Sequence, residues 1–119
     1  MKSDHSLAKS FKFAFEGIKT EFIKGRNFRI QVSLGLIAVI LGIIYKIPTY
    51  EWFDLILVIA SVLILELINT AIEALVDMVS PEIQEKAKIA KDVSAGAVLV
   101  ASVAALVVGA FLFIPKIFH

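Results

Sequence analysis

The sequence contains no cysteine among its 119 residues, and this absence excludes disulfide bridges and thiolate metal sites. Charged residues are scarce as well, at 19% of the chain, whereas 59% of the residues are hydrophobic. The mean hydropathy is +0.88. So small a polar fraction cannot cover the surface of a water-soluble domain of this length. The net charge of +1 also offers no excess of positive charge for a nucleic-acid partner.

Hydrophobic residues are gathered into three long runs, over 30–47, 52–79 and 88–114. At about 1.5 Å per residue, a helix of this length crosses about 30 Å of hydrocarbon. We therefore predict an all-α membrane protein whose single domain, residues 1–119, contains three transmembrane helices. Each helix is expected to end at a proline. These prolines are Pro48, Pro81 and Pro115.

The segment 6–26 mixes charges with aromatic residues. Its apolar side chains recur every three or four residues and so share one helical face. They are Leu7, Phe11, Phe15, Ile18 and Phe22. This pattern predicts an amphipathic helix that lies on the membrane surface, with lysines facing anionic headgroups. The alternative is a helix packed on another protein surface.

Lysine and arginine are unevenly distributed between the expected loops. Seven of the twelve precede the first span, and three more, Lys86, Lys88 and Lys91, follow the second span. The first loop and the C-terminal tail have one each, Lys46 and Lys116. Because basic segments stay in the cytoplasm, we expect the N-terminus and the second loop inside, and the first loop and the C-terminus outside.

Polar residues interrupt the second hydrophobic run at Glu66, Asn69, Glu73 and Asp77. At about 100° per residue these four positions fall on one helical face, and we call them the polar stripe. Ionisable groups inside a span cost a few kcal/mol each, so three carboxylates on one face indicate a function. Structural hydrogen bonds within the bundle are the alternative without a function. By spacing alone, a proton or cation relay is almost as well supported as an enzyme.

Phosphoryl transfer needs a metal, a cation on the phosphates and a base on the nucleophile. Glu73 and Asp77 are hard oxygen ligands suited to Mg²⁺, and Lys91, which begins the third span, can hold a phosphate. Glu66 lies deeper, where poor hydration suits a proton acceptor for a hydroxyl group. A relay would need acids across the whole bilayer, but none occurs over 55–65. The pattern therefore favours a site that opens to one side.

Three blocks resemble the prokaryotic diacylglycerol kinase and undecaprenol kinase family, and the resemblance covers nearly the whole chain. They are Arg26–Ile30 (RNFRI), Glu66–Asp77 (ELINTAIEALVD) and Ala90–Leu99 (AKDVSAGAVL). The resemblance implies a lipid kinase of the bacterial cytoplasmic membrane that uses MgATP. It also implies a homotrimeric bundle of three-span subunits, with active sites shared between neighbours.

The same resemblance assigns roles to the polar residues of these blocks. Glu66 is implied as the catalytic base on the lipid hydroxyl, Glu73 as a ligand of the ATP-bound Mg²⁺, and Lys91 as a contact of the terminal phosphates. The remaining nucleotide-site residues are Asn69, Asp77 and Asp92.

The sequence departs from the family pattern at Gly25, where the family usually has a glutamate that binds metal. Glu21 lies one helical turn earlier. We hypothesise that Glu21 takes over as a metal ligand, or that the metal is held with more water. Gln84 also stands where a histidine is often found. The residues of the motifs resemble those of Gram-positive members, which favours undecaprenol over diacylglycerol as the substrate. Because of Gly25, a catalytically inactive relative is a further alternative.

Overall fold

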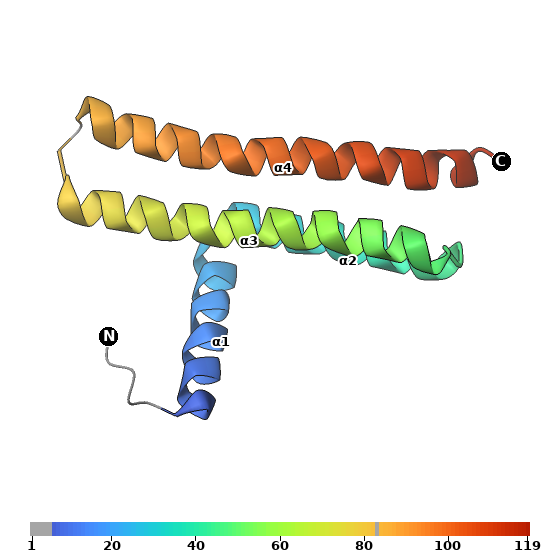
Figure 1. Cartoon of the computed structure of the whole chain (residues 1–119), viewed down its shortest axis with the longest axis horizontal. Helices are drawn as coiled ribbons and strands as arrows, with labels where there is room; N and C mark the ends of the chain where they lie inside the picture. Colours follow the sequence, from blue (N-terminus) through green and yellow to red (C-terminus); the bar gives the residue numbers. More distant parts are fainter. Residues whose placement is uncertain (1–5, 83) are drawn as a thin grey trace.

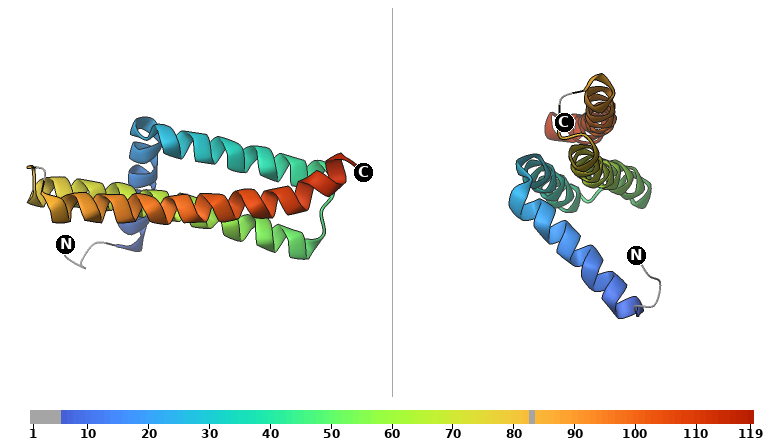
Figure 2. Two further views of the ribbon diagram at one scale, coloured as in Figure 1. Left: turned by 90° about the horizontal axis from the view of Figure 1, so that it is seen from above. Right: turned by 90° about the vertical axis from the view of Figure 1, so that its left-hand side faces the viewer.

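The computed structural model describes residues 6–82 and 84–119, which form four helices. They are α1 (Leu7–Lys24), α2 (Arg26–Ile44), α3 (Thr49–Val79) and α4 (Glu85–Ile117). Helices α2, α3 and α4 are long and apolar enough to cross a membrane. Helix α3 packs against both α2 and α4, and α1 leaves the bundle sideways (Figures 1 and 2). The predicted all-α fold with an N-terminal helix and three spans is confirmed.

The three spanning helices differ in length. Helix α2 has 19 residues, or about 28 Å, which matches about 30 Å of hydrocarbon. Helices α3 and α4 have 31 and 33 residues, or about 46–50 Å, so both exceed that thickness. Figure 1 shows the α3–α4 hairpin projecting past the point where α1 joins α2. The helices are longer than the spans expected over 30–47, 52–79 and 88–114.

Helix α1 begins at Ser6, whose hydroxyl accepts a hydrogen bond from the Lys9 amide at 3.3 Å, a normal N-cap. The N-terminal part of its apolar face is largely exposed: Leu7 is 75% exposed and Phe15 is 68% exposed. Apolar side chains uncovered on a helix next to three spans suit the boundary of a bilayer.

A single residue, Gly25, separates α1 from α2. The Arg29 guanidinium donates hydrogen bonds to the carbonyl oxygens of Phe22 and Ile23 at 2.8 and 2.7 Å. These carbonyls belong to the last turn of α1 and lack partners within their own helix. Arg29 thus ties α2 to the end of α1 and fixes the direction in which α1 leaves the bundle.

Helix α2 ends at Ile44, so the expectation that Pro48 stops this helix is wrong. Lys46 adopts a left-handed conformation with φ of 51°. The Ile47 amide donates to the Gly42 carbonyl at 3.1 Å, and the Lys46 amide donates to the Ile43 carbonyl at 3.2 Å. This pair of bonds is a Schellman motif, which satisfies the last carbonyls of the helix. Pro48 instead occupies the N-cap of α3.

Helix α4 continues through Pro115 to Ile117, so the expectation that Pro115 closes this helix is also wrong. Proline lacks one amide hydrogen, but this close to the helix end the loss is small, and the Phe118 amide still donates to the Ile114 carbonyl at 3.1 Å. Lys116 pairs with Glu51 of α3 at 2.9 Å. The pair closes the bundle beside a buried cluster formed by Ile47, Leu55, Leu112 and Phe113.

Candidate active site

The polar stripe runs along α3 from the inside of the bundle to its projecting end. Glu66 and Asn69 are buried, with exposed fractions of 8% and 7%. Glu73 is half-buried and Asp77 is exposed. The gradient gives each carboxylate a different degree of hydration, with the driest acid at the deep end.

Glu66 meets polar groups from two other helices. Gln31 of α2 donates a long hydrogen bond from Nε2 to Glu66 Oε1 at 3.5 Å. Glu21 of α1 and Glu73 lie near enough for their charges to act on Glu66. The buried end of the stripe is therefore influenced by carboxylates of both α1 and α3. Sequence reasoning gave Gln31 no role, although a polar residue inside an apolar run was the signal that could have identified it.

Glu21 is the one buried residue of α1, with 7% of its surface exposed. The Thr70 hydroxyl of α3 donates a hydrogen bond to its carboxylate. The C-terminal end of α1, held by Arg29, thus brings Glu21 against the face of α3. Thr70 lies inside the ELINTAIEALVD block, but sequence reasoning assigned it no role.

Gly25 leaves room for the Glu21 side chain. A Cβ atom at position 25 would lie 2.7 Å from the Glu21 carbonyl oxygen and 2.9 Å from Glu21 Cδ. The φ of Gly25 is −94°, which any residue can adopt. What this position needs from glycine is therefore space, since a side chain here would displace the carboxylate of Glu21.

Lys91 of α4 lies at the open end of the stripe. Its ammonium group pairs with Asp77 at 2.5 Å, and the Glu73 charge acts on it as well. Asp92 pairs instead with Lys88 of its own helix at 2.6 Å. The structure thus pairs Lys91, but not Asp92, with the stripe of α3.

The carboxylates around the stripe are candidate ligands for Mg²⁺. Among the described residues, no three histidine or acidic side chains converge as a complete metal cage. Mg²⁺ is usually held by one or two carboxylates together with waters and substrate phosphates. Within the described chain, no cation pairs with Glu21, Glu66 or Glu73, and clustered negative charge in poorly hydrated surroundings favours a divalent cation. The residues therefore fit Mg²⁺ carried by a nucleotide.

Three helices long and apolar enough to cross a membrane, with a row of acidic side chains on the central one, define a multi-pass membrane protein. The family described as prokaryotic diacylglycerol kinase matches residues 12–113. The chain belongs to this family and is a membrane lipid kinase, which confirms the resemblance seen in its three sequence blocks.

Individual relatives carry two different names. A diacylglycerol kinase of Synechocystis is 40% identical over 94% of this chain, which spans 65% of that relative's length. An undecaprenol kinase of Bacillus subtilis is 37% identical over 92% of this chain and 89% of the relative. A diacylglycerol kinase of Escherichia coli K12 is 30% identical over 85% of this chain and 83% of the relative.

Proposed function

We propose that the protein transfers the γ-phosphoryl group of ATP to the hydroxyl group of a lipid alcohol dissolved in the membrane. One observation carries this proposal: the stripe of α3 has a buried carboxylate, Glu66, at one end and a cation, Lys91, at the other. A base inside the bilayer suits an acceptor that arrives through lipid. A cation beyond the hydrocarbon suits phosphates that arrive through water.

In the proposed reaction, Glu66 takes the proton of the lipid hydroxyl group. The hydroxyl oxygen bonds to the γ-phosphorus of ATP as the bond between that phosphorus and ADP breaks. Gln31, which donates to Glu66, keeps the carboxylate oriented. Lys91 exchanges Asp77 for the terminal phosphates. Mg²⁺ bound with ATP supplies charge neutralisation on the phosphates, and Glu73 and Glu21 would hold it.

The other nucleotide-site residues are Asn69, Asp77 and Asp92. Asn69 Oδ1 is buried and has no hydrogen-bond partner within the described chain, so it is free to accept a bond from the nucleotide. Asp92 and Lys88 form an exposed pair, which a ligand or a neighbouring subunit can reach. We also propose a homotrimer with sites shared between subunits, as the resemblance of the three sequence blocks to the family implies.

The proposed topology places the N-terminus and the second loop in the bacterial cytoplasm and the C-terminus outside. Two features support it. Basic residues gather on the proposed cytoplasmic segments. Asp77 and Lys91, the proposed contacts of cytoplasmic ATP, lie near the ends of α3 and α4 that the second loop joins.

We propose undecaprenol as the acceptor, with undecaprenyl phosphate as the product. The similarity to the B. subtilis undecaprenol kinase supports it, since it extends over 89% of that relative. The alternative acceptor is diacylglycerol, giving phosphatidic acid, because a diacylglycerol kinase is similarly related at 40% identity.

The test is a radiolabelled-ATP assay of the purified protein in mixed micelles, with undecaprenol and diacylglycerol offered at equal mole fraction. We expect the undecaprenol product to dominate and to vanish when Mg²⁺ is omitted. Preferential labelling of diacylglycerol would establish the alternative substrate. Labelling of neither lipid would contradict the proposed reaction.

Replacing Lys91 by alanine should raise the KM for ATP by about tenfold, since a charge-assisted contact to phosphate is lost at a partly exposed site. The KM for the lipid should not change. Lys86→Ala is the matched control, because Lys86 lies exposed on the same helix. Equal ATP dependence of the two variants would argue against the phosphate role of Lys91.

A further inference from the structure

The carboxylate of Glu21 is held from two sides. Its Oε2 atom accepts a hydrogen bond from the Thr70 hydroxyl of α3. Its Oε1 atom lies in the space that a Cβ atom on Gly25 would occupy. Only 7% of Glu21 is exposed, so its carboxylate is enclosed and its two oxygen atoms have different neighbours.

The Thr70 hydroxyl donates its proton to another helix. A hydroxyl group has a single hydrogen to donate, and inside a helix it can give that hydrogen to the carbonyl four residues earlier. Ser61 of α3 does so, with a bond to the Leu57 carbonyl at 2.7 Å. Thr70 instead donates to a residue 49 positions away in the sequence. The Thr70 hydroxyl therefore serves a contact between α1 and α3.

Thr70 sets the level along the polar stripe at which this contact is made. It lies four residues after Glu66 and three residues before Glu73, so the three side chains share one face of α3. The bond from Thr70 therefore brings Glu21 to the stripe between these two acids. The Glu21 charge acts on Glu66, as this placement requires.

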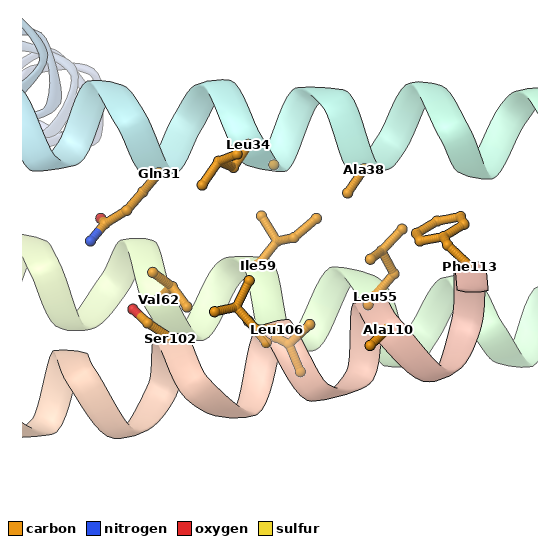
Figure 3. A pocket seen from close by; sticks show the side chains of 14 residues that line it. Gln31, Leu34, Ala38, Leu55, Ile59, Val62, Ser102, Leu106, Ala110 and Phe113 are labelled. Carbon is orange, nitrogen blue, oxygen red and sulfur yellow. The ribbon is translucent and has the colours of Figure 1, made fainter. Parts of the chain in front are cut away.

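Gln31 lies between the polar stripe and an apolar cavity. Its side chain extends from α2 toward α3 (Figure 3) and donates to Glu66. It also lines a cavity of about 440 Å³, where Ser102 is the one other polar residue among the described lining residues. Such a cavity offers a divalent cation almost no oxygen ligands. A metal ion at the stripe therefore has to find its ligands among the carboxylates, Glu21 included.

We propose that Thr70 positions Glu21 as a metal ligand, by holding Oε2 and leaving Oε1 as the atom that binds the ion. Naming the ion Mg²⁺ carried by ATP rests on the proposed function. Thr70 contacts neither the ion nor a substrate in this role, so it acts only through Glu21.

A carboxylate held in place binds a metal ion more tightly than a free one. A glutamate side chain loses rotamer freedom when it is ordered, and Thr70 removes part of this freedom before the ion arrives. Carboxylates that bind metals are usually hydrogen-bonded themselves, and loss of such a partner typically costs about 10–100-fold in metal affinity. The Thr70 bond should therefore contribute about tenfold, the lower end of that range.

The same bond restricts how Glu21 can bind an ion. With Oε2 engaged by Thr70, Glu21 offers one oxygen atom and not two. Mg²⁺ demands a near-octahedral shell, whereas Ca²⁺ takes about 6–8 oxygen ligands and readily accepts both oxygens of one carboxylate. Mn²⁺ also suits an octahedral shell of oxygens. The Thr70 bond should therefore favour Mg²⁺ and Mn²⁺ over Ca²⁺.

The test is Mn²⁺ binding to Thr70→Val and Thr70→Ser, measured by electron paramagnetic resonance with a non-hydrolysable ATP analogue. Valine keeps the branched shape of threonine but has no donor, so Mn²⁺ affinity should fall about tenfold. Serine keeps the hydroxyl group and should restore most of the affinity. Ser61→Ala is the matched control, because the Ser61 hydroxyl bonds within its own helix. Wild-type Mn²⁺ affinity in Thr70→Val, or equal losses in the two Thr70 variants, would overturn the proposal.

Two further readouts separate positioning from a general loss of structure. In a Glu21→Ala background, Thr70→Val should weaken Mn²⁺ binding no further, because Thr70 acts only through Glu21. The ratio of the Ca²⁺ to the Mn²⁺ dissociation constant, obtained by competition, should fall in Thr70→Val, whereas a general loss would weaken both ions alike. Additive losses in the double variant, or an unchanged ratio, would overturn the proposal.

Lipid phosphorylation by the same proteins separates this proposal from the proposed function. If Mn²⁺ binding depends on Thr70 but neither undecaprenol nor diacylglycerol is phosphorylated, the positioning role is supported and the proposed function is refuted. If a lipid is phosphorylated but Mn²⁺ binding does not depend on Thr70, the role of Thr70 alone is refuted.

Discussion

Replacing Glu66 by glutamine should reduce turnover by about 10²–10⁴-fold, the usual contribution of a general base. Glutamine keeps the size of the side chain and can still pair with Gln31, the hydrogen-bond donor to Glu66 in the wild type. It cannot accept the proton of the lipid hydroxyl. Because the substitution also removes a buried negative charge, the variant should fold at least as well as the wild type.

The measurement is the rate of lipid phosphorylation in a single turnover, together with ATP affinity from equilibrium dialysis. A base acts in the chemical step, so the rate should fall while ATP affinity and assembly size stay close to those of the wild type. Glu16→Gln is the control, since Glu16 is an exposed carboxylate on α1. A Glu66→Gln protein that keeps near wild-type turnover would show that the base lies elsewhere.

The sequence predicted the spans and the polar stripe because both depend on periodicity. In lipid, a single long apolar segment can form all its backbone hydrogen bonds only as a helix. The spacing of Glu66, Asn69, Glu73 and Asp77 then places these side chains on one face, whatever the rest of the chain does. The structure adds the burial gradient along that face, which depends on the packing of α2 and α4.

The helix ends were predicted less well, because proline was read as the only stop signal. Helix α2 stops at a Schellman motif in which Lys46 takes the left-handed conformation usually given to glycine. Helix α4 passes through Pro115 because only its final turn is affected. Ile47 is buried in the core cluster. This tertiary contact stabilises the Schellman motif at the end of α2, and no local sequence pattern reveals it.

Contacts between helices were also not predicted from the sequence. Gln31 reaches Glu66 and Thr70 reaches Glu21 from helices far apart in the sequence. Their partners depend on how the helices rotate against one another, and that rotation is set by many packing contacts at once. A polar residue inside an apolar run was a usable signal for Gln31, but it could not indicate which side chain it would meet.

Removing the carboxylate of Glu21 should raise the Mg²⁺ concentration needed for half-maximal activity by at least about 10–100-fold, the range typical of losing a side chain that supports a metal site. Glu21 is buried against α3 and accepts a hydrogen bond from Thr70. A buried carboxylate without a cation partner among the described residues is costly unless something binds it. We expect Glu21→Ala to weaken metal use while leaving the KM for the lipid unchanged.

Metal binding should be measured without turnover, by electron paramagnetic resonance of Mn²⁺ in the presence of a non-hydrolysable ATP analogue. Glu21→Ala should bind Mn²⁺ more weakly than the wild type, whereas Glu16→Ala should match it, because Glu16 is exposed on the same helix. Unchanged Mn²⁺ affinity in Glu21→Ala would show that Glu21 has a purely structural role.

The position of this carboxylate, and not only its presence, can be tested at Gly25. A Cβ atom there would approach the carbonyl oxygen and Cδ of Glu21 to 2.7 and 2.9 Å, closer than real atoms tolerate, so Gly25→Ala must move both the backbone carbonyl and the side chain of Glu21. The variant keeps every carboxylate yet should lose Mn²⁺ affinity in the same direction as Glu21→Ala. Gly17→Ala makes the same change on α1 with nothing within 4 Å and should have no effect. Metal affinity that survives Gly25→Ala would mean that the metal does not depend on where Glu21 is held.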